Sequence, residues 1–303
     1  MAKQGDALRS WVRTKADQAT REVLQQRLTG TRVMAVTSGK GGVGKSSMVL
    51  NLSMALAERG QRIVILDADL GLANINIMLG NEPVYTLWDV VEHRVSLRDT
   101  LAEGPNGIRI IPGGSGITEL ARLDSVAITH IIEAFQELEG ECDWLLIDTS
   151  AGISDNVLAF VLAADEALVV TNPEPTALAD AYGLIKAVWE QDGQVALKLI
   201  MNRVQTRDQG TRLGTRLTDL ALKALGQPVE FLGQVGEDPV VARSVVKQVP
   251  FYQSYPNSEA ARDVGDLADY LLHRVPPPRR GGWGAFVRRL VENWPREINQ
   301  DPI

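Results

Sequence analysis

Residues 38–47 carry the groups best suited to chemistry, in the order SGKGGVGKSS. Gly39, Gly44, Lys45 and Ser46 match the spacing G-x-x-x-x-G-K-[ST] of a loop that binds nucleotide phosphates. Its glycines admit backbone N–H groups to the phosphates, its lysine neutralises them, and its serine hydroxyl binds Mg²⁺. Lys40 is one lysine more than such a loop requires. We predict a Mg²⁺–nucleotide site that includes Gly39, Gly41, Gly42, Val43, Gly44, Lys45, Ser46 and Ser47.

Three aspartates follow apolar segments and could complete this site. Asp67 and Asp69 end the segment LDAD, and Asp148 follows LLI. Carboxylates at the carboxyl ends of parallel strands lie beside a bound phosphate. We expect Asp148 to hold the Mg²⁺ shell through water, together with Ser46. Asp67 and Asp69 are candidates for the same shell and for orienting the attacking water, and their roles stay open.

Base recognition is predicted at Asn202 and Arg203. The guanine-specific pattern NKxD is absent, and the corresponding segment reads MNRV. The amide can bond to a base edge, and the guanidinium can stack on the base. We therefore expect ATP rather than GTP.

Short apolar segments alternate with longer amphipathic ones across the middle of the chain. Strands are predicted at 32–38, 62–67, 107–112, 144–148, 166–171, 195–201 and 229–234. Helices are expected to begin near residues 44, 125, 153, 176, 209, 239 and 258. This alternation, with the phosphate loop, predicts an α/β P-loop NTPase fold with a mostly parallel sheet and helices on both faces.

The net charge of −7 is unevenly distributed along the 303 residues. Residues 1–32 hold seven Lys/Arg against three Asp/Glu, and residues 272–303 hold six against three, so the middle is strongly acidic. An acidic body is repelled by phosphate backbones, so we expect no direct nucleic-acid binding. A single cysteine, three scattered histidines and no apolar leader favour a cytoplasmic protein without a zinc site.

Both ends are predicted to form units of their own. Residues 1–30 read as a helical extension, because one face of a helix over residues 6–28 is apolar. Residues 31–274 form the nucleotide-binding domain. Residues 275–282, VPPPRRGG, read as a linker, because prolines end a helix and glycines free the chain. Residues 283–303 then form an amphipathic helix and tail.

The segment WGAFVRRLVENW has one apolar and one polar side at about 100° per residue. Arg288, Arg289, Glu292 and Asn293 fall on the polar side. Tryptophans opposite a basic face suit the surface of an anionic membrane. The alternatives are a helix that packs permanently on the body, and a helix that is sheltered in the monomer and released in the dimer. The predicted membrane contacts are Trp283, Phe286, Val287, Leu290, Val291 and Trp294.

Four segments, SGKGGVGKSS, DADLGLANINIMLG, DTSAGIS and TNPEPTALADAYGLIK, resemble the MinD/ParA family of deviant phosphate-loop ATPases. The segment IIPGGSGITEL and the N-terminal extension are similar to the members that regulate flagellar number. The resemblance is continuous over about residues 30–272. It implies a face-to-face dimer that forms with ATP. Together with the amphipathic tail, this dimer predicts a protein that cycles on the inner face of the cytoplasmic membrane, including at the cell pole.

The resemblance also implies roles for individual residues. Lys40 reaches the phosphates of the partner protomer, as an arginine finger does. Asp69 activates or orients the water, Asp67 and Asp148 support the metal, and Asn74 lies in a nucleotide-sensing switch. For Glu174 two interpretations stay open: contact with the nucleotide across the dimer, or a favourable charge at the start of a helix.

An N-terminal motif of the flagellar regulators, DQAxxLR, stimulates a signal-recognition-type GTPase, FlhF. This chain reads DQATREV, so Asp17, Gln18 and Ala19 match, whereas Glu22 and Val23 replace Leu and Arg. The reversed charge puts stimulation of an FlhF-like partner in question. An ordinary amphipathic helix is the alternative.

Taken together, the sequence favours a slow, partner-stimulated ATPase that regulates flagellar number or placement. Its expected partners are a second copy of itself, an anionic membrane, an FlhF-like GTPase, and flagellar switch or transcription-regulatory proteins. The rival functions are division-site selection of the MinD type and DNA partitioning of the ParA type. A scaffold with an inactive site is disfavoured, because the lysines and aspartates of the site are all present.

Overall fold

The structure, a computed structural model, describes residues 30–69, 74–113, 125–191, 195–274 and 280–295, with residues 125–128 as backbone only. Asp17, Gln18 and Ala19, and residues 275–279 of the predicted linker, lie outside the described residues.

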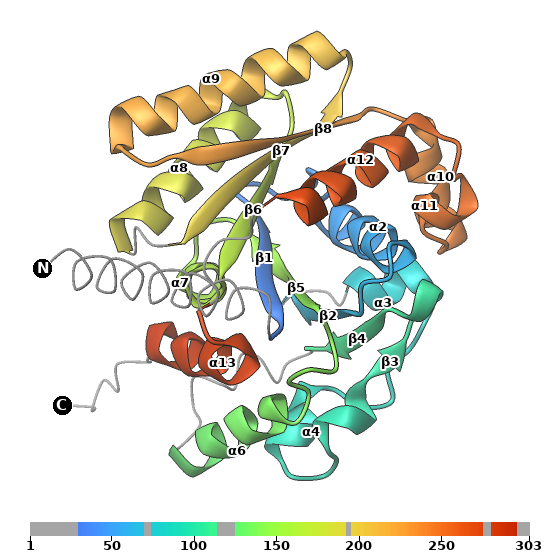
Figure 1. Ribbon diagram of the computed structural model, residues 1–303, viewed down its shortest axis with the longest axis vertical. Coiled ribbons are helices and arrows are strands. Elements are labelled where there is room, and N and C mark those ends of the chain that lie inside the picture. The colour runs from blue at the N-terminus through green and yellow to red at the C-terminus, as the bar shows by residue number, and fades with distance from the viewer. Residues whose placement is uncertain (1–29, 70–73, 114–124, 192–194, 275–279, 296–303) are drawn as a thin grey trace, which may run out of the picture.

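The described residues form one eight-stranded sheet in the order β3-β4-β2-β5-β1-β6-β7-β8 (Figure 1). Short β3 pairs antiparallel with β4, and the other neighbours pair in parallel. The predicted α/β fold and mostly parallel sheet are confirmed. Among the described strands, only the two-residue β3 was not predicted. The strands are β1 (Arg32–Ser38), β2 (Ile63–Ala68), β3 (Ala102–Glu103), β4 (Arg109–Pro112), β5 (Trp144–Ala151), β6 (Glu166–Thr171), β7 (Ala196–Val204) and β8 (Val229–Gly236).

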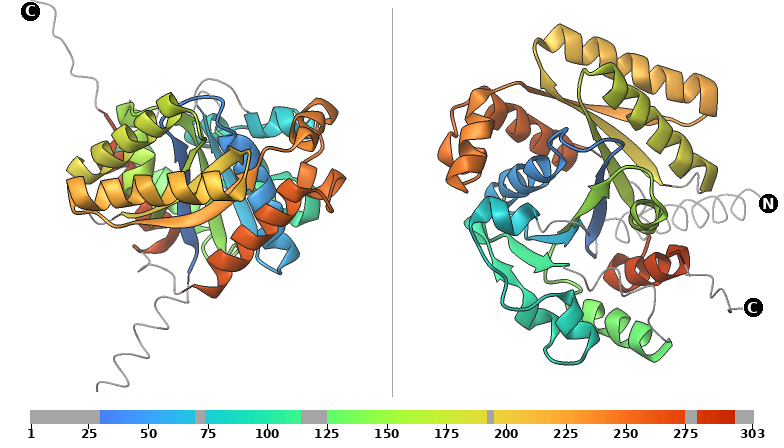
Figure 2. Two further views of the ribbon diagram at one scale, coloured as in Figure 1. Left: turned by 90° about the horizontal axis from the view of Figure 1, so that it is seen from above. Right: turned by 180° about the vertical axis from the view of Figure 1, so that it is seen from behind.

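Helices cover both faces of the sheet (Figures 1 and 2). Successive residues of β1 point to opposite faces, so Val33 and Ala35 join one apolar core while Met34 and Val36 join the other. One face carries α2 (Lys45–Glu58), α3 (Asn74–Leu79), α10 (Pro239–Lys247), α11 (Phe251–Ser254) and α12 (Glu259–His273). The other carries α4 (Leu87–Val91), α6 (Ser125–Gln136), α7 (Asp155–Ala163), α8 (Pro175–Gln191), α9 (Arg207–Leu225) and α13 (Gly282–Asn293).

Two short 3₁₀ turns, η1 (Leu97–Thr100) and η2 (Pro105–Gly107), flank the strand β3. None of the described helices is long and apolar enough to cross a membrane.

The C-terminal helix α13 is part of the folded body, where it packs against α6 and α7. Gly281 and Gly282 do not leave the chain free, because their φ angles of 105° and 67° turn it into the helix. Val291 is half-buried. The other predicted membrane contacts are buried in a protein core in this arrangement, so their contact with lipid stays a prediction that requires α13 to leave the body: Trp283, Phe286, Val287, Leu290 and Trp294.

Polar contacts hold α13 on the body as well. The indole Nε1 of Trp283 donates to Oγ1 of Thr31 at 2.9 Å, and its backbone N–H donates to Glu139. Nε of Arg289 donates to the carbonyl of Ala163 at 2.8 Å, and the Arg289 side chain is only 16% exposed. Arg289 therefore does not belong to a solvent face, because it caps the carboxyl end of α7.

Candidate functional site

The phosphate loop connects the central strand β1 to α2, as predicted. Gly44 has φ 94°, and a Cβ there would lie 2.3 Å from Nδ2 of Asn202. A Cβ at Gly39 would lie 2.3 Å from the backbone of Asp180. Both positions therefore require glycine, one for its backbone conformation and one for a close approach to α8.

Lys45 begins α2, and its Nζ lies 2.6 Å from Oδ1 of Asp148 at the end of β5. Both side chains are buried. Burial raises the pKa of Asp148, and the Lys45 ammonium and the Ser46 hydroxyl oppose that rise. The pair brings together a cation suited to a phosphate and a carboxylate suited to a metal.

Two buried polar atoms at this point fit a bound nucleotide. Oγ of Ser47 and Oδ2 of Asp148 have no hydrogen-bond partner among the described residues. Buried polar atoms are normally satisfied, so these two indicate a place where a ligand completes the bonding. The Ser46 hydroxyl lies beside Asp148, where both could serve a Mg²⁺ shell.

The register of β2 on β5 brings two carboxylates together, because Asp67 lies opposite Asp148. Burial and the nearby Asp148 raise the pKa of Asp67 to about 7. The described residues hold no group of three or more His, Cys, Asp or Glu that could bind a metal. Mg²⁺ still fits, since it commonly takes one or two carboxylates and completes its shell with water and phosphate oxygens. When bound, Mg²⁺ neutralises charge on the phosphates.

Asp69 lies two residues beyond Asp67, just past the end of β2, and is bonded on both carboxylate oxygens. Oγ of Ser150 donates to Oδ1 at 2.8 Å, and Nδ2 of Asn74 donates to Oδ2 at 2.8 Å. Asn74 therefore contacts Asp69 directly, a contact that the sequence did not predict. Ser150 was not predicted, although its place at the end of β5 beside Asp148 was a usable signal.

Lys40 is held within its own protomer. Its Nζ lies 2.8 Å from Oε2 of Glu174 and 3.0 Å from Oγ1 of Thr176, at the start of α8. The Lys40 ammonium lowers the pKa of Glu174. Contact of Glu174 with a nucleotide stays a prediction, and its contact in this chain is with Lys40.

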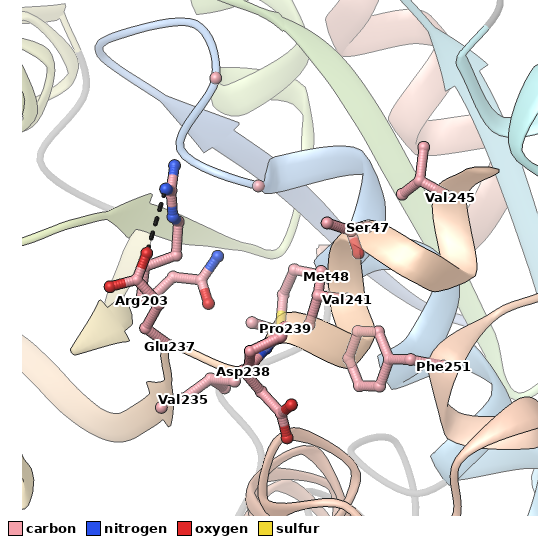
Figure 3. A pocket seen from close by; sticks show the side chains of 15 residues that line it. Ser47, Met48, Arg203, Val235, Glu237, Asp238, Pro239, Val241, Val245 and Phe251 are labelled. Carbon is pink, nitrogen blue, oxygen red and sulfur yellow. Dashed lines mark hydrogen bonds and ion pairs between the residues drawn. The ribbon is translucent and has the colours of Figure 1, made fainter. Parts of the chain in front are cut away.

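A cavity of about 660 Å³ adjoins the phosphate loop (Figure 3). Asn202 and Arg203 line it, and their recognition of a base stays a prediction. Nδ2 of Asn202 donates to the carbonyl of Val43 at 2.7 Å. Arg203 lies 3.3 Å from Glu237, and it could stack on a base. The remaining wall, from the end of β8 and from α10 and α11, was missed because its residues match no motif: Val235, Glu237, Asp238, Pro239, Val241, Val245 and Phe251.

The ParA family, described as "NUBPL iron-transfer P-loop NTPase", matches residues 30–272. The antiactivator FleN of Pseudomonas aeruginosa is 39% identical over 86% of this chain and 94% of that protein. The septum site-determining protein MinD of Bacillus subtilis is 35% identical over 80% of this chain and 90% of that protein. The flagellum site-determining protein YlxH of Helicobacter pylori is 29% identical over 86% and 90%.

Two solved structures are similar in fold. MinD from the MinC:MinD cell division complex of Aquifex aeolicus has a TM-score of 0.64 at 28% identity, covering 83% of this chain and all of that one. MinD of Pyrococcus horikoshii with Mg-ADP has a TM-score of 0.62 at 29% identity, covering 80% and 96%. The loop, the aspartates and these similarities agree, and the chain belongs to the ParA/MinD family of P-loop NTPases.

Proposed function

We propose that this chain is an ATPase switch that dimerises with ATP, cycles on the membrane and regulates flagellar number or placement. The buried Lys45–Asp148 pair, 2.6 Å apart beside unsatisfied Ser47, is the observation that carries ATP and Mg²⁺ binding. The similarity to FleN and YlxH supports the flagellar role. Hydrolysis yields ADP and phosphate, and it is slow until a partner assembles the site.

In the proposed dimer, Lys40 contacts the nucleotide of the second protomer. The Lys40 side chain is 39% exposed and lies at the rim of the loop, so it can leave Glu174 for the phosphates of a second protomer. A cation supplied in trans stabilises charge in the transition state. Hydrolysis would then occur only in the assembled dimer.

Membrane binding requires α13 to leave its groove. Helix α7 links the two sites, because it starts just after Ala151 of β5 and ends at Ala163, where Arg289 binds. A nucleotide-dependent shift of the β5–α7 loop would therefore loosen α13. Two released helices on one dimer bind a membrane more strongly than one.

Vesicle co-sedimentation tests this proposal, with anionic and neutral vesicles and with ATP or ADP. Sedimentation that needs both ATP and anionic lipid supports the switch. Arg288→Glu is the informative variant, because Arg288 is exposed on α13 and its change lowers attraction to lipid without disturbing the groove. Sedimentation equal in ATP and ADP contradicts nucleotide-dependent release.

Division-site selection is a second candidate, favoured by the 35% identity to MinD of Bacillus subtilis. Deletion of the gene separates the two: altered flagellar number supports the first function, and misplaced septa with normal flagella support the second. A ParA-type role requires ATP-dependent DNA co-sedimentation. Stimulation of an FlhF-like GTPase, lost in Gln18→Ala, would establish the N-terminal partner site.

A further inference from the structure

Asp69 is held by hydrogen bonds from two separate elements of the chain. Ser150 reaches it from the end of β5, and Asn74 reaches it from the first residue of α3. Each bond is 2.8 Å long and ends on a different carboxylate oxygen. A carboxylate bonded at both oxygens cannot rotate freely, so its orientation is set by the protein.

The strand register explains why Ser150 can do this. On β2 and β5, Asp67 lies opposite Asp148, and Ala68 lies opposite Thr149. Asp69 and Ser150 are the next residues along the two chains, and they meet through their side chains. The register of β5 on β1 shifts between Asp148 and Ala151, so Ser150 lies in an irregular part of the strand, where its hydroxyl donates to Asp69.

The local backbone keeps Ser150 in place. Ala151 is paired with Ser38 of β1, and the N–H of Gly152 donates to the carbonyl of Ser38 at 2.8 Å. Ser150 is therefore tied to β1 just before the phosphate loop begins.

We propose that Ser150 is a positioning residue for hydrolysis, which fixes Asp69 in the orientation that activates the attacking water. The inference rests on the proposed ATPase function. Asp69 receives the hydroxyl hydrogen bond of Ser150 on Oδ1, and in this proposal the water lies against the same side chain. Small errors in the placement of a reacting group cost large factors in rate, so loss of the hydroxyl lowers kcat.

The test compares Ser150→Ala with Ser150→Thr in steady-state ATPase assays of the full chain. Ser150→Ala is expected to lower kcat about tenfold, since a hydrogen bond to a charged group is removed, while KM for ATP stays within about twofold. Ser150→Thr keeps the hydroxyl and should restore most of kcat. Melting temperature and ATP affinity, measured alongside, should stay unchanged in both variants.

Ser154→Ala is the matched control. Ser154 precedes α7 on the same loop, is exposed, and its side chain makes no capping bond to that helix. Its loss should leave kcat unchanged. A Ser150→Ala enzyme with wild-type kcat, or one altered only in KM, would overturn the inference, as would a Ser150→Thr enzyme as slow as Ser150→Ala. A wild-type chain that hydrolyses no ATP would instead contradict the proposed function itself.

Discussion

The ammonium of Lys40 lies 2.8 Å from the carboxylate of Glu174 in the same protomer. The two side chains are 39% and 55% exposed, so the pair is surrounded by water and weak. Lys40 is therefore held in cis by a contact that a more strongly charged partner can replace. In the proposed dimer, the phosphates of a second protomer would be such a partner.

Glu174→Gln is expected to favour the dimer by removing the competing charge. The ATP concentration for half-maximal dimerisation should fall about two- to fivefold, the range expected for a weak surface pair. Analytical ultracentrifugation with ATP measures this. Glu190→Gln is the control, because Glu190 forms a comparably exposed pair with Lys186 on the same helix. Equal shifts in the two variants would contradict a specific role of Glu174.

Asp148→Asn should abolish the effect of Mg²⁺ while the chain still folds. The amide keeps the size of the side chain, but it supplies no charge to a metal and leaves the buried Lys45 unpaired. ATPase activity is expected to fall at least about a hundredfold, as it should for wild type in EDTA. Calorimetric titration of ATP with and without Mg²⁺ checks this: a variant that keeps the wild-type response to Mg²⁺ would exclude Asp148 from the metal site.

Cys142 is a native reporter for the release of α13. It is the only cysteine in the sequence and is 1% exposed, against the Trp283 side of α13. Arg289→Ala removes the cap on α7 and should speed alkylation of Cys142 about tenfold or more, because opening becomes more frequent. Arg288→Ala, one residue away and exposed, should not. Equal alkylation rates in the two variants would rule out Arg289 as a latch.

Alkaline pH should destabilise the fold partly through Cys142. Burial raises the pKa of this thiol from 9.0 to about 11. Between these values the unfolded chain releases a proton that the folded chain retains, so the free energy of unfolding falls as pH rises. Urea unfolding at pH 8 and pH 10.5 should show a loss about 1–2 kcal/mol larger in wild type than in Cys142→Ala. Identical losses would show that the thiol does not contribute.

Gly44→Ala should abolish nucleotide binding with little loss of secondary structure. The left-handed φ of 94° and the amide of Asn202 both oppose a side chain here, so the loop must change shape. Fluorescence titration with a labelled ATP measures the affinity, and circular dichroism measures the fold. Gly60→Ala is the control, because Gly60 also has a left-handed φ, of 79°, but no atom lies within 4 Å of the added Cβ. Retained ATP affinity in Gly44→Ala would contradict a strict glycine requirement.

The sequence predicted the sheet well because apolar strands and amphipathic helices have different periods. Each predicted strand overlaps an observed one, and β1 matches residue for residue. The phosphate loop was predictable for a related reason: its function depends on a contiguous motif. Asp148 followed from the rule that parallel strands present their carboxyl ends at one edge.

The contacts that the sequence did not give are long-range ones. Periodicity showed that one side of α13 is apolar, but both a membrane and a protein core satisfy an apolar side. In this arrangement the core is favoured by two hydrogen bonds, from the Trp283 indole to Thr31 and from the Arg280 backbone N–H to Asp165. Both acceptors lie more than 100 residues away in sequence. The Ser150–Asp69 bond depends on strand register, which a single sequence does not specify.

The packing of α13 has a consequence for any protomer that releases it. Departure uncovers not only the apolar side of the helix but also the groove lined by Phe135 and Phe160. Lipid can cover the apolar side of the helix, yet the apolar groove stays exposed to water and can associate with the exposed groove of another protomer. Release away from a surface would therefore drive aggregation, and the lifetime of the open protomer in solution must be short.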